Sequence, residues 1–140
     1  MVTLKKPAFA VVLVVIAGTS LVGGASVASS ADSSVKTGVW GAQGVILTVR
    51  DADAAIEYDC GRGTIAQKLV LDRNNKFDVP GRHFREGGPT RLDDEGEAAR
   101  YQATVRGDTL TLTVALSQSQ ETLGPFTLTF GRQVILKKCQ

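Results

Sequence analysis

Apolar and polar residues alternate along most of the chain beyond residue 37, as in strands that bury one face. The clearest case runs from Thr109 to Leu116, where leucine and valine alternate with threonine. A period of two places one set of side chains on each face of a sheet. This pattern predicts strands over Val45–Arg50, Ala55–Cys60, Thr64–Leu71, Lys76–Val79, His83–Glu86, Ala99–Arg106, Thr109–Leu116, Leu123–Phe130 and Gln133–Cys139.

Turn residues separate these strands. Gly107-Asp108 and Gly131-Arg132 each place glycine first in a two-residue loop, which is typical of a type II′ hairpin. Asn74-Asn75 can accept positive φ and indicates another tight turn. Further breaks are expected at Asp51–Asp53 and at Cys60–Gly63. We count eight strands, because His83–Glu86 can continue the preceding strand past a bend at Pro80-Gly81.

Short links between consecutive strands predict an antiparallel meander. Closing the sheet into a small barrel removes its two exposed edges, so we expect a closed or nearly closed all-β barrel. An open two-sheet sandwich is the alternative. Cys60 and Cys139 are the two cysteines of the chain, and we expect them to form a disulfide that joins the first and last strands. A loop of about 80 residues closed in this way gives roughly 4–5 kcal/mol in the chain-entropy model.

The first 31 residues have the order of a secretory signal peptide. Lys5 and Lys6 precede an uncharged apolar run, and small residues follow as far as Ala31. A membrane anchor is the alternative, but the apolar run is short for a spanning helix. We therefore expect a signal peptide at 1–31, a flexible segment at 32–37 and one domain at 38–140. The product is expected to be secreted or periplasmic, with no stable membrane anchor.

Charge changes the view of possible partners. The chain holds 16 basic and 14 acidic residues, and Lys5 and Lys6 account for the excess. Without the signal peptide the chain is neutral, whereas a protein that neutralises phosphates carries a basic excess. We therefore expect no nucleic-acid partner; the partner is an unknown protein or small ligand.

Catalytic signatures are absent from the sequence. His83 is the only histidine, and the chain offers no second histidine or free cysteine with which to share a metal. The acidic run at 93–97 lacks the alternating ligand spacing of a calcium loop. No nucleophile elbow or phosphate loop occurs. The expectation is a protein without catalytic activity, metal or cofactor.

The most plausible contact surface is the long connection from Gly81 to Glu97. It combines a Gly-Gly-Pro bend with an aromatic residue, and functional residues often lie on such loops. An ordinary surface connection is the alternative. Its candidate binding residues are Arg82, His83, Arg85 and Arg91.

Several short motifs resemble known families. The sequences Gly38-Val39-Trp40-Gly41, Ile56–Ile65, Phe77–Gly81, Arg85–Pro89, Arg100-Tyr101 and Lys138-Cys139 together resemble a family of small exported bacterial β-barrel proteins that has no characterised activity. This resemblance implies export and a barrel fold.

Two further resemblances imply different functions. Tyr58-Asp59-Cys60, Ala99-Arg100-Tyr101 and Cys139-Gln140 resemble periplasmic inhibitors of C-type lysozyme, which implies that Arg100 would pair with acidic catalytic groups. Alanines replace the serine that those inhibitors insert. The Gly-x-Trp at Trp40 resembles the first strand of lipocalins, which implies a small-ligand carrier; a tryptophan buried in a filled core is the alternative. We expect a non-enzymatic binding module, with a hydrolase inhibitor or a lipocalin-like carrier as alternatives.

Overall fold

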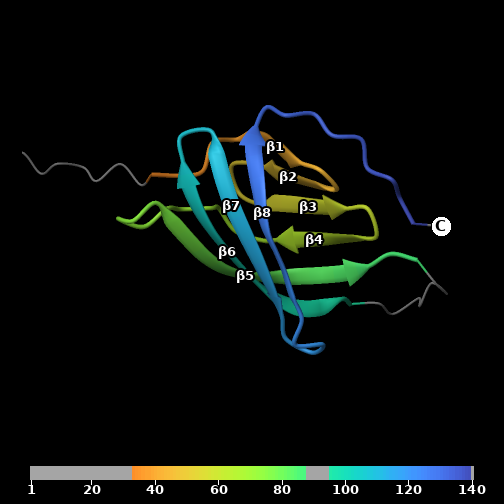
Figure 1. Cartoon of the computed structure of the whole chain (residues 1–140). Helices are drawn as coiled ribbons and strands as arrows, with labels where there is room; N and C mark the ends of the chain where they lie inside the picture. The colour runs from red at the N-terminus through yellow and green to blue at the C-terminus, as the bar shows by residue number, and fades with distance from the viewer. Residues whose placement is uncertain (1–32, 88–94, 140) are drawn as a thin grey trace, which may run out of the picture.

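The computed structural model describes residues 33–87 and 95–139, and in these ranges the chain forms a closed antiparallel barrel of eight strands (Figure 1). The predicted fold class is thus confirmed. The described residues contain no helix long and apolar enough to cross a membrane. The strands are β1 (Gly38–Ala42), β2 (Val45–Val49), β3 (Ala54–Tyr58), β4 (Gly61–Ile65), β5 (Lys76–Arg85), β6 (Glu97–Arg106), β7 (Thr109–Leu116) and β8 (Thr122–Phe130).

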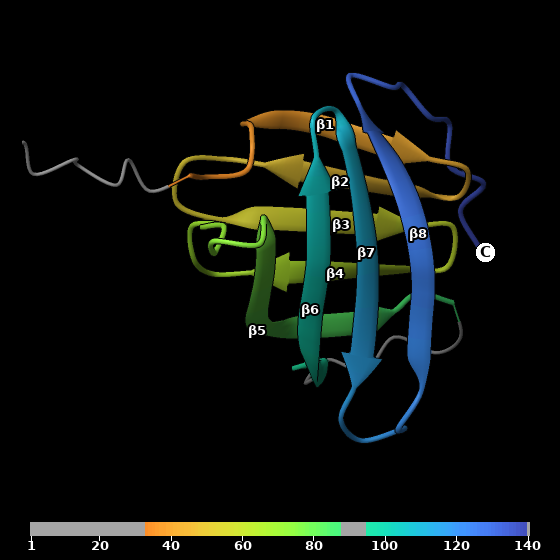
Figure 2. The same ribbon diagram turned by 60° about the vertical axis from the view of Figure 1, so that its left-hand side comes forward.

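Each strand pairs with the next, and β8 returns to β1 to close the barrel. This seam is short: Trp40 is opposite Phe130 and Gly41 is opposite Thr129. Figure 2 shows β1 to β4 running across the direction of β6 to β8, with β5 bending from one group to the other. The first part of β5 pairs only with β6, Arg82 and His83 pair with both β6 and β4, and the last two residues pair only with β4.

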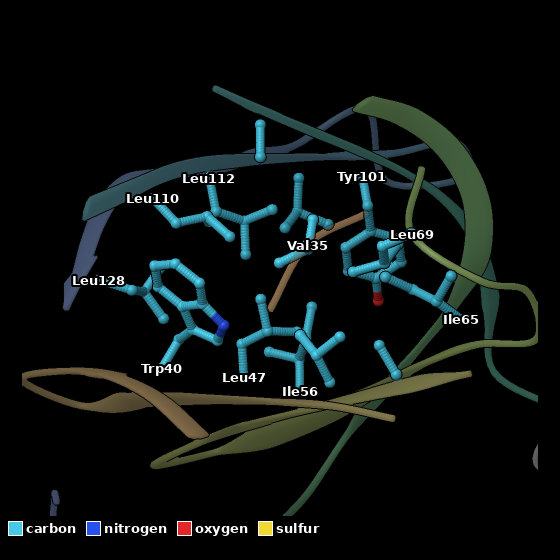
Figure 3. Packing of buried hydrophobic residues seen from close by; sticks show 14 of the residues in the cluster. Val35, Trp40, Leu47, Ile56, Ile65, Leu69, Tyr101, Leu110, Leu112 and Leu128 are labelled. Atoms are coloured by element: carbon cyan, nitrogen blue, oxygen red, sulfur yellow. The ribbon is translucent and has the colours of Figure 1, made fainter. Parts of the chain in front are cut away.

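Alternation in the sequence corresponds to the two faces of the barrel wall. On β7 the leucines and Val114 are buried, whereas the threonines face outward. The interior is filled by side chains from all parts of the wall (Figure 3). The largest fully buried ones are Trp40, Tyr101, Leu47, Ile56, Ile65, Leu69, Leu110, Leu112, Leu128, Val45 and Val114.

Two of the predicted tight turns have the expected geometry. Arg106 and Thr109 pair across a two-residue loop in which Gly107 has φ +59°, as a type II′ turn requires. Asn75 has φ +57°, and its N–H donates to the carbonyl of Asp72 at 3.1 Å. These positions were predictable because the turn type depends on local backbone preference.

Strand positions at the two ends of the chain differ from the prediction. The first strand, Gly38–Ala42, was not predicted, because it is short and two of its five residues are glycine. The last predicted strand, Gln133–Cys139, is instead an irregular tail in which Ile135 is 95% exposed. The edge of β8 that such a strand would need is occupied by β1 at this point.

β4 also differs: it covers Gly61–Ile65 rather than Thr64–Leu71. Gly63 and Gly81 are not breaks but strand positions beside the ring of Tyr101. A Cβ on Gly63 would lie 2.1 Å from Tyr101 Oη, and a Cβ on Gly81 would lie 2.5 Å from its ring. These glycines therefore provide space for a buried tyrosine. The bend at Pro80-Gly81 leaves β5 continuous, as the eight-strand count required.

Cys60 and Cys139 are joined by a disulfide, with their Cα atoms 5.0 Å apart. The pairing was predicted correctly, but its structural role was not. Cys60 lies in the β3–β4 turn and Cys139 in the tail, so the bond anchors the tail to this turn instead of joining the first and last strands. Main-chain bonds support this anchor: Cys139 N–H donates to Asp59 O at 3.0 Å, and Lys137 N–H donates to Asp59 Oδ1 at 2.8 Å.

The opposite end of the barrel is filled by residues that precede β1 and follow β4. Val35 is buried, and its N–H donates to Leu69 O at 3.0 Å; Leu69 is buried as well. We call the region of Val35 and Leu69 the plugged end. Of the described residues in the segment 32–37, which we expected to be flexible, Val35 is buried in the core and its neighbours are exposed. The expected signal peptide, 1–31, lies outside the described residues.

Candidate functional site

A pocket of about 210 Å³ opens at the end of the barrel that carries the disulfide. We call it the rim pocket. Its walls come from the end of β3, the β3–β4 turn, the end of β5 and the neighbouring parts of β7 and β8. The lining residues are Tyr58, Cys60, Gly61, His83, Arg85, Leu116, Glu121, Leu123 and Phe126.

Strand alternation places the central rings of the rim pocket. Tyr58 is the last inward position of β3, two residues beyond Ile56, and His83 is an inward position of β5. The centroid of the Tyr58 ring lies 5.6 Å from that of His83 and 5.8 Å from that of Phe126. Three rings from three strands thus meet at this end of the barrel.

Two polar atoms in this group have no hydrogen-bond partner among the described residues: Tyr58 Oη and His83 Nδ1. Their residues are buried, with only 9% and 6% of their surface exposed. A buried polar atom without a partner costs about 1–3 kcal/mol, and most buried polar groups in proteins are paired. Both residues line the rim pocket, so this pair marks the rim pocket as a candidate binding site.

Electrostatics keeps both groups neutral near pH 7. Burial raises the pKa of the Tyr58 hydroxyl, and the nearby Tyr101 adds to this effect. Burial lowers the pKa of His83, and the positive charge of Arg85 lowers it further, while Glu97 and Glu121 act in the opposite direction. The pocket therefore presents an uncharged hydroxyl and an uncharged imidazole between apolar walls.

Charged residues at the rim are paired with one another. An Arg85 Nη2 donates to Glu121 Oε2 at 2.7 Å, which connects the end of β5 to the start of β8. Lys138 of the tail lies 3.2 Å from Glu86 and donates to the carbonyl of Tyr58. Both ion pairs are exposed, so they contribute little stability and mainly position the rim.

The residues predicted to form a binding surface separate in the structure. Arg82, His83 and Arg85 lie on β5 itself, not on a loop. His83 and Arg85 share the inward face and line the rim pocket. Arg82 faces outward, 4.0 Å from Glu95. Arg91 lies outside the described residues.

Arg100 also lies away from the rim pocket. It is an outward position in the middle of β6, and its Nε donates to Asp78 Oδ1 at 2.5 Å. Gln102 donates to the other carboxylate oxygen of Asp78 at 3.1 Å. Hydrogen bonds from Gln102 and Arg100 lower the pKa of Asp78, so the carboxylate that holds Arg100 stays ionised.

Sequence reasoning did not single out Tyr58, Leu123 or Phe126 as site residues. Each reads as an ordinary inward position of a strand, and nothing local marks it as the wall of a pocket. The one available signal was the position of Tyr58, two residues before a disulfide cysteine. Phe126 follows 68 positions later, so their contact depends on the closure of the barrel.

The described residues contain no group of three or more histidine, cysteine or acidic side chains arranged to hold a metal. Comparisons of the sequence with protein-family models, with curated proteins and with solved structures give no match. What the rim pocket can do therefore follows from its own chemistry: it can hold a ring-sized group and hydrogen-bond it through Tyr58 and His83.

Proposed function

We propose that this chain is an exported, non-enzymatic binding module that holds a ring-sized polar group in the rim pocket. One observation carries the proposal: Tyr58 Oη and His83 Nδ1 are buried there and have no hydrogen-bond partner in the described part of the chain. A ligand that supplies those partners recovers a desolvation cost already present in the free protein. The leader-like segment 1–31 and the Cys60–Cys139 disulfide support export.

Pocket size limits the ligand. Small-molecule sites in proteins usually measure about 300–1,000 Å³, whereas the rim pocket measures about 210 Å³. The barrel interior is filled by side chains such as Trp40 and Tyr101, both fully buried. These observations favour a single ring or one side chain of a partner over the larger ligand of a lipocalin-like carrier.

The chemistry of the walls narrows the ligand further. Leu116, Leu123 and Phe126 provide apolar contact, while Tyr58 and His83 provide neutral hydrogen-bonding groups. A phenol ring matches this combination, because it has an apolar body and a hydroxyl that both donates and accepts. Arg100, the residue that an inhibitor of hydrolases would use, is held by Asp78 on the outer wall, so the rim pocket is the better basis for a function.

Titration with small rings tests the proposal. Phenol and toluene are added separately to the ¹⁵N-labelled protein without residues 1–31, and amide shifts are followed by NMR. We expect phenol to shift residues around Tyr58 and His83 and to bind more tightly than toluene. Tyr58→Phe should weaken phenol about tenfold, equivalent to about 1.4 kcal/mol, and leave toluene unchanged.

Tyr101→Phe is the matched control, because it removes the same hydroxyl from another buried ring while the rim pocket is left intact. It should not alter the affinity for phenol. If neither ring shifts the rim-pocket residues at millimolar concentration, or if both tyrosine variants weaken phenol equally, the proposal is wrong.

A further inference from the structure

Among the described strands, none pairs with one edge of β8 beside the rim pocket. From Thr122 to Leu128 it pairs with β7 on one side. On its other side β1 reaches only Thr129 and Phe130, and no other described strand pairs there. Figure 2 shows β8 as the last strand of the group β6 to β8, with the tail running from its end.

Two main-chain hydrogen bonds show which groups lie along this edge. The N–H of Phe130 donates to Asp108 O, on the side of β7, whereas the N–H of Gly131 donates to Val39 O, on the side of β1. Main-chain groups of successive strand residues point to opposite sides. The N–H and carbonyl of Thr127 therefore point away from β7, beyond the last residue of β8 that β1 reaches.

Exposed edges are usually protected by charges, prolines or bulges. β8 carries no charged residue between Thr122 and Phe130. Pro125 and a bulge opposite Leu112–Val114 interrupt its first part. The usable edge is therefore short, from Phe126 to Leu128, and it is unprotected by charge. Phe126 is also a wall of the rim pocket, so the edge and the pocket form one continuous surface.

We infer that an extended segment of a partner protein adds to β8 as a further strand and places one aromatic side chain in the rim pocket. This inference rests on the proposed function and names its partner. In strand addition, main-chain hydrogen bonds provide affinity and a side-chain pocket provides specificity. Here Thr127 supplies the main-chain groups, and Tyr58 and His83 bind the polar tip of the ring. A tyrosine in a β-branched, uncharged segment has the required chemistry.

Capped pentapeptides of the form Thr-Val-Xaa-Val-Thr test this inference by calorimetry and NMR. With tyrosine at the centre we expect binding at least tenfold tighter than with alanine, and tighter than phenol alone. In an extended peptide, alternate main-chain N–H groups point to opposite sides. Methylating the nitrogens of the set that faces β8 should weaken binding of the tyrosine peptide at least tenfold. Methylating the other set should change its affinity less than twofold, because only one set faces β8.

A variant of the protein provides the reciprocal test. Thr127→Pro removes an N–H that faces away from β7, so it should abolish tyrosine-peptide binding and retain phenol binding. Retained phenol binding also shows that the variant is folded. The matched control is Thr127→Val, which keeps the N–H and should bind the peptide normally. Thr111→Pro cannot serve as a control, because its strand β7 is paired on both sides.

The outcomes separate the two proposals. If phenol binds but the tyrosine peptide binds no more tightly, or if neither methylated set matters, strand addition is wrong while the proposed function stands. Failure of both phenol and peptide overturns both. If the chain forms dimers in sedimentation that Thr127→Pro abolishes, the edge belongs to a second copy and the inferred partner is wrong.

Discussion

The two tyrosines of this barrel have the same residue type and the same inward orientation but different surroundings. Tyr101 Oη donates to the carbonyl of Arg82 at 2.7 Å, and its ring occupies the space left by Gly63 and Gly81. Tyr58 Oη has no partner among the described residues. Burial raises the pKa of both hydroxyls. Strand alternation thus buries both rings, but only the neighbouring strands decide whether a hydroxyl is satisfied.

The same contrast separates the plugged end from the end that carries the rim pocket. Near the plugged end, Trp40 is fully buried, and its indole N–H donates to Lys36 O at 3.1 Å. At the other end a pocket remains, where Tyr58 Oη and His83 Nδ1 find no partner within residues 33–87 and 95–139. Proteins tend to retain poorly satisfied groups where function requires them. The plugged end therefore provides stability, and the rim pocket is the place to look for binding.

The largest expected effect comes from removing the disulfide. Cys60→Ser with Cys139→Ser should lower the free energy of unfolding by about 4–5 kcal/mol, because the bond spans 79 positions of the chain. The seam should persist, since β1 and β8 pair independently of this bond. Chemical denaturation measures the change in the free energy of unfolding. NOE contacts between Trp40 and Phe130 show whether β1 and β8 remain paired at the seam. Loss of those contacts would show that the disulfide holds the seam after all.

Truncating one ring near the plugged end and one ring of the rim pocket should give the next largest changes in the free energy of unfolding. Trp40→Ala should cost about 3–5 kcal/mol, as expected for a fully buried ring. Phe126→Ala should cost about 1–2 kcal/mol, because Phe126 is only partly buried. Phenol binding should be lost in the second variant and kept in the first, if enough of it folds. Equal costs in denaturation experiments would contradict the distinction between the two regions.

Adding a methyl group to an inward glycine should have different costs beside Tyr101 and in the rim pocket. Gly63→Ala places its Cβ against Tyr101 Oη and should cost about 1–3 kcal/mol through overpacking. Gly61→Ala lies two residues earlier on the same face, where its nearest neighbour would be Phe84 O at 3.0 Å. We expect a smaller cost there and a reduced affinity for phenol, measured by thermal unfolding and NMR titration. The reverse order of costs would refute the role assigned to Gly63.

Removing the hydroxyl of Tyr101 and removing that of Tyr58 should have opposite effects on the free energy of unfolding. Tyr101→Phe leaves Arg82 O without its donor and should lower the free energy of unfolding by about 1 kcal/mol. Tyr58→Phe removes a buried atom that has no partner, so the free energy of unfolding should stay the same or rise by up to about 1 kcal/mol. Paired denaturation curves measure both changes. A loss of stability in Tyr58→Phe would mean that its hydroxyl is satisfied in solution.

The smallest expected effect is a dependence on pH that arises from His83, the only histidine of the chain. Its pKa lies below 6.5 in the folded protein because of burial and of Arg85. The unfolded chain therefore takes up a proton first as pH falls, so stability should be complete above pH 6.5 and decrease below it. His83→Gln should flatten this decrease between about pH 7 and 5. A folded-state titration of His83 above 6.5 by NMR would reverse the expected sign.

Local patterns were sufficient for most of the barrel wall. The leucine–threonine alternation of Thr109–Leu116 and the Gly107-Asp108 turn predicted a hairpin that the structure contains. They were insufficient for Gly38–Ala42, whose pairing with β8 makes it a strand in spite of its glycines. They also misplaced Gln133–Cys139, because β1 already pairs with Thr129 and Phe130, where a hairpin with β8 would have to begin. Of the residues that the sequence predicted to bind a partner, His83 and Arg85 line the rim pocket.

The sequence by itself determined which wall residues face inward, where two of the tight turns fall and that two cysteines pair, because these depend on local periodicity, local backbone preference and composition. Only the tertiary structure decided that Tyr58, His83 and Phe126 meet, and that Tyr58 lacks the partner that Tyr101 has. The physical reason is that a hydrogen bond or a pocket depends on distances between strands far apart in the chain. Barrel closure sets those distances, and no local pattern records them.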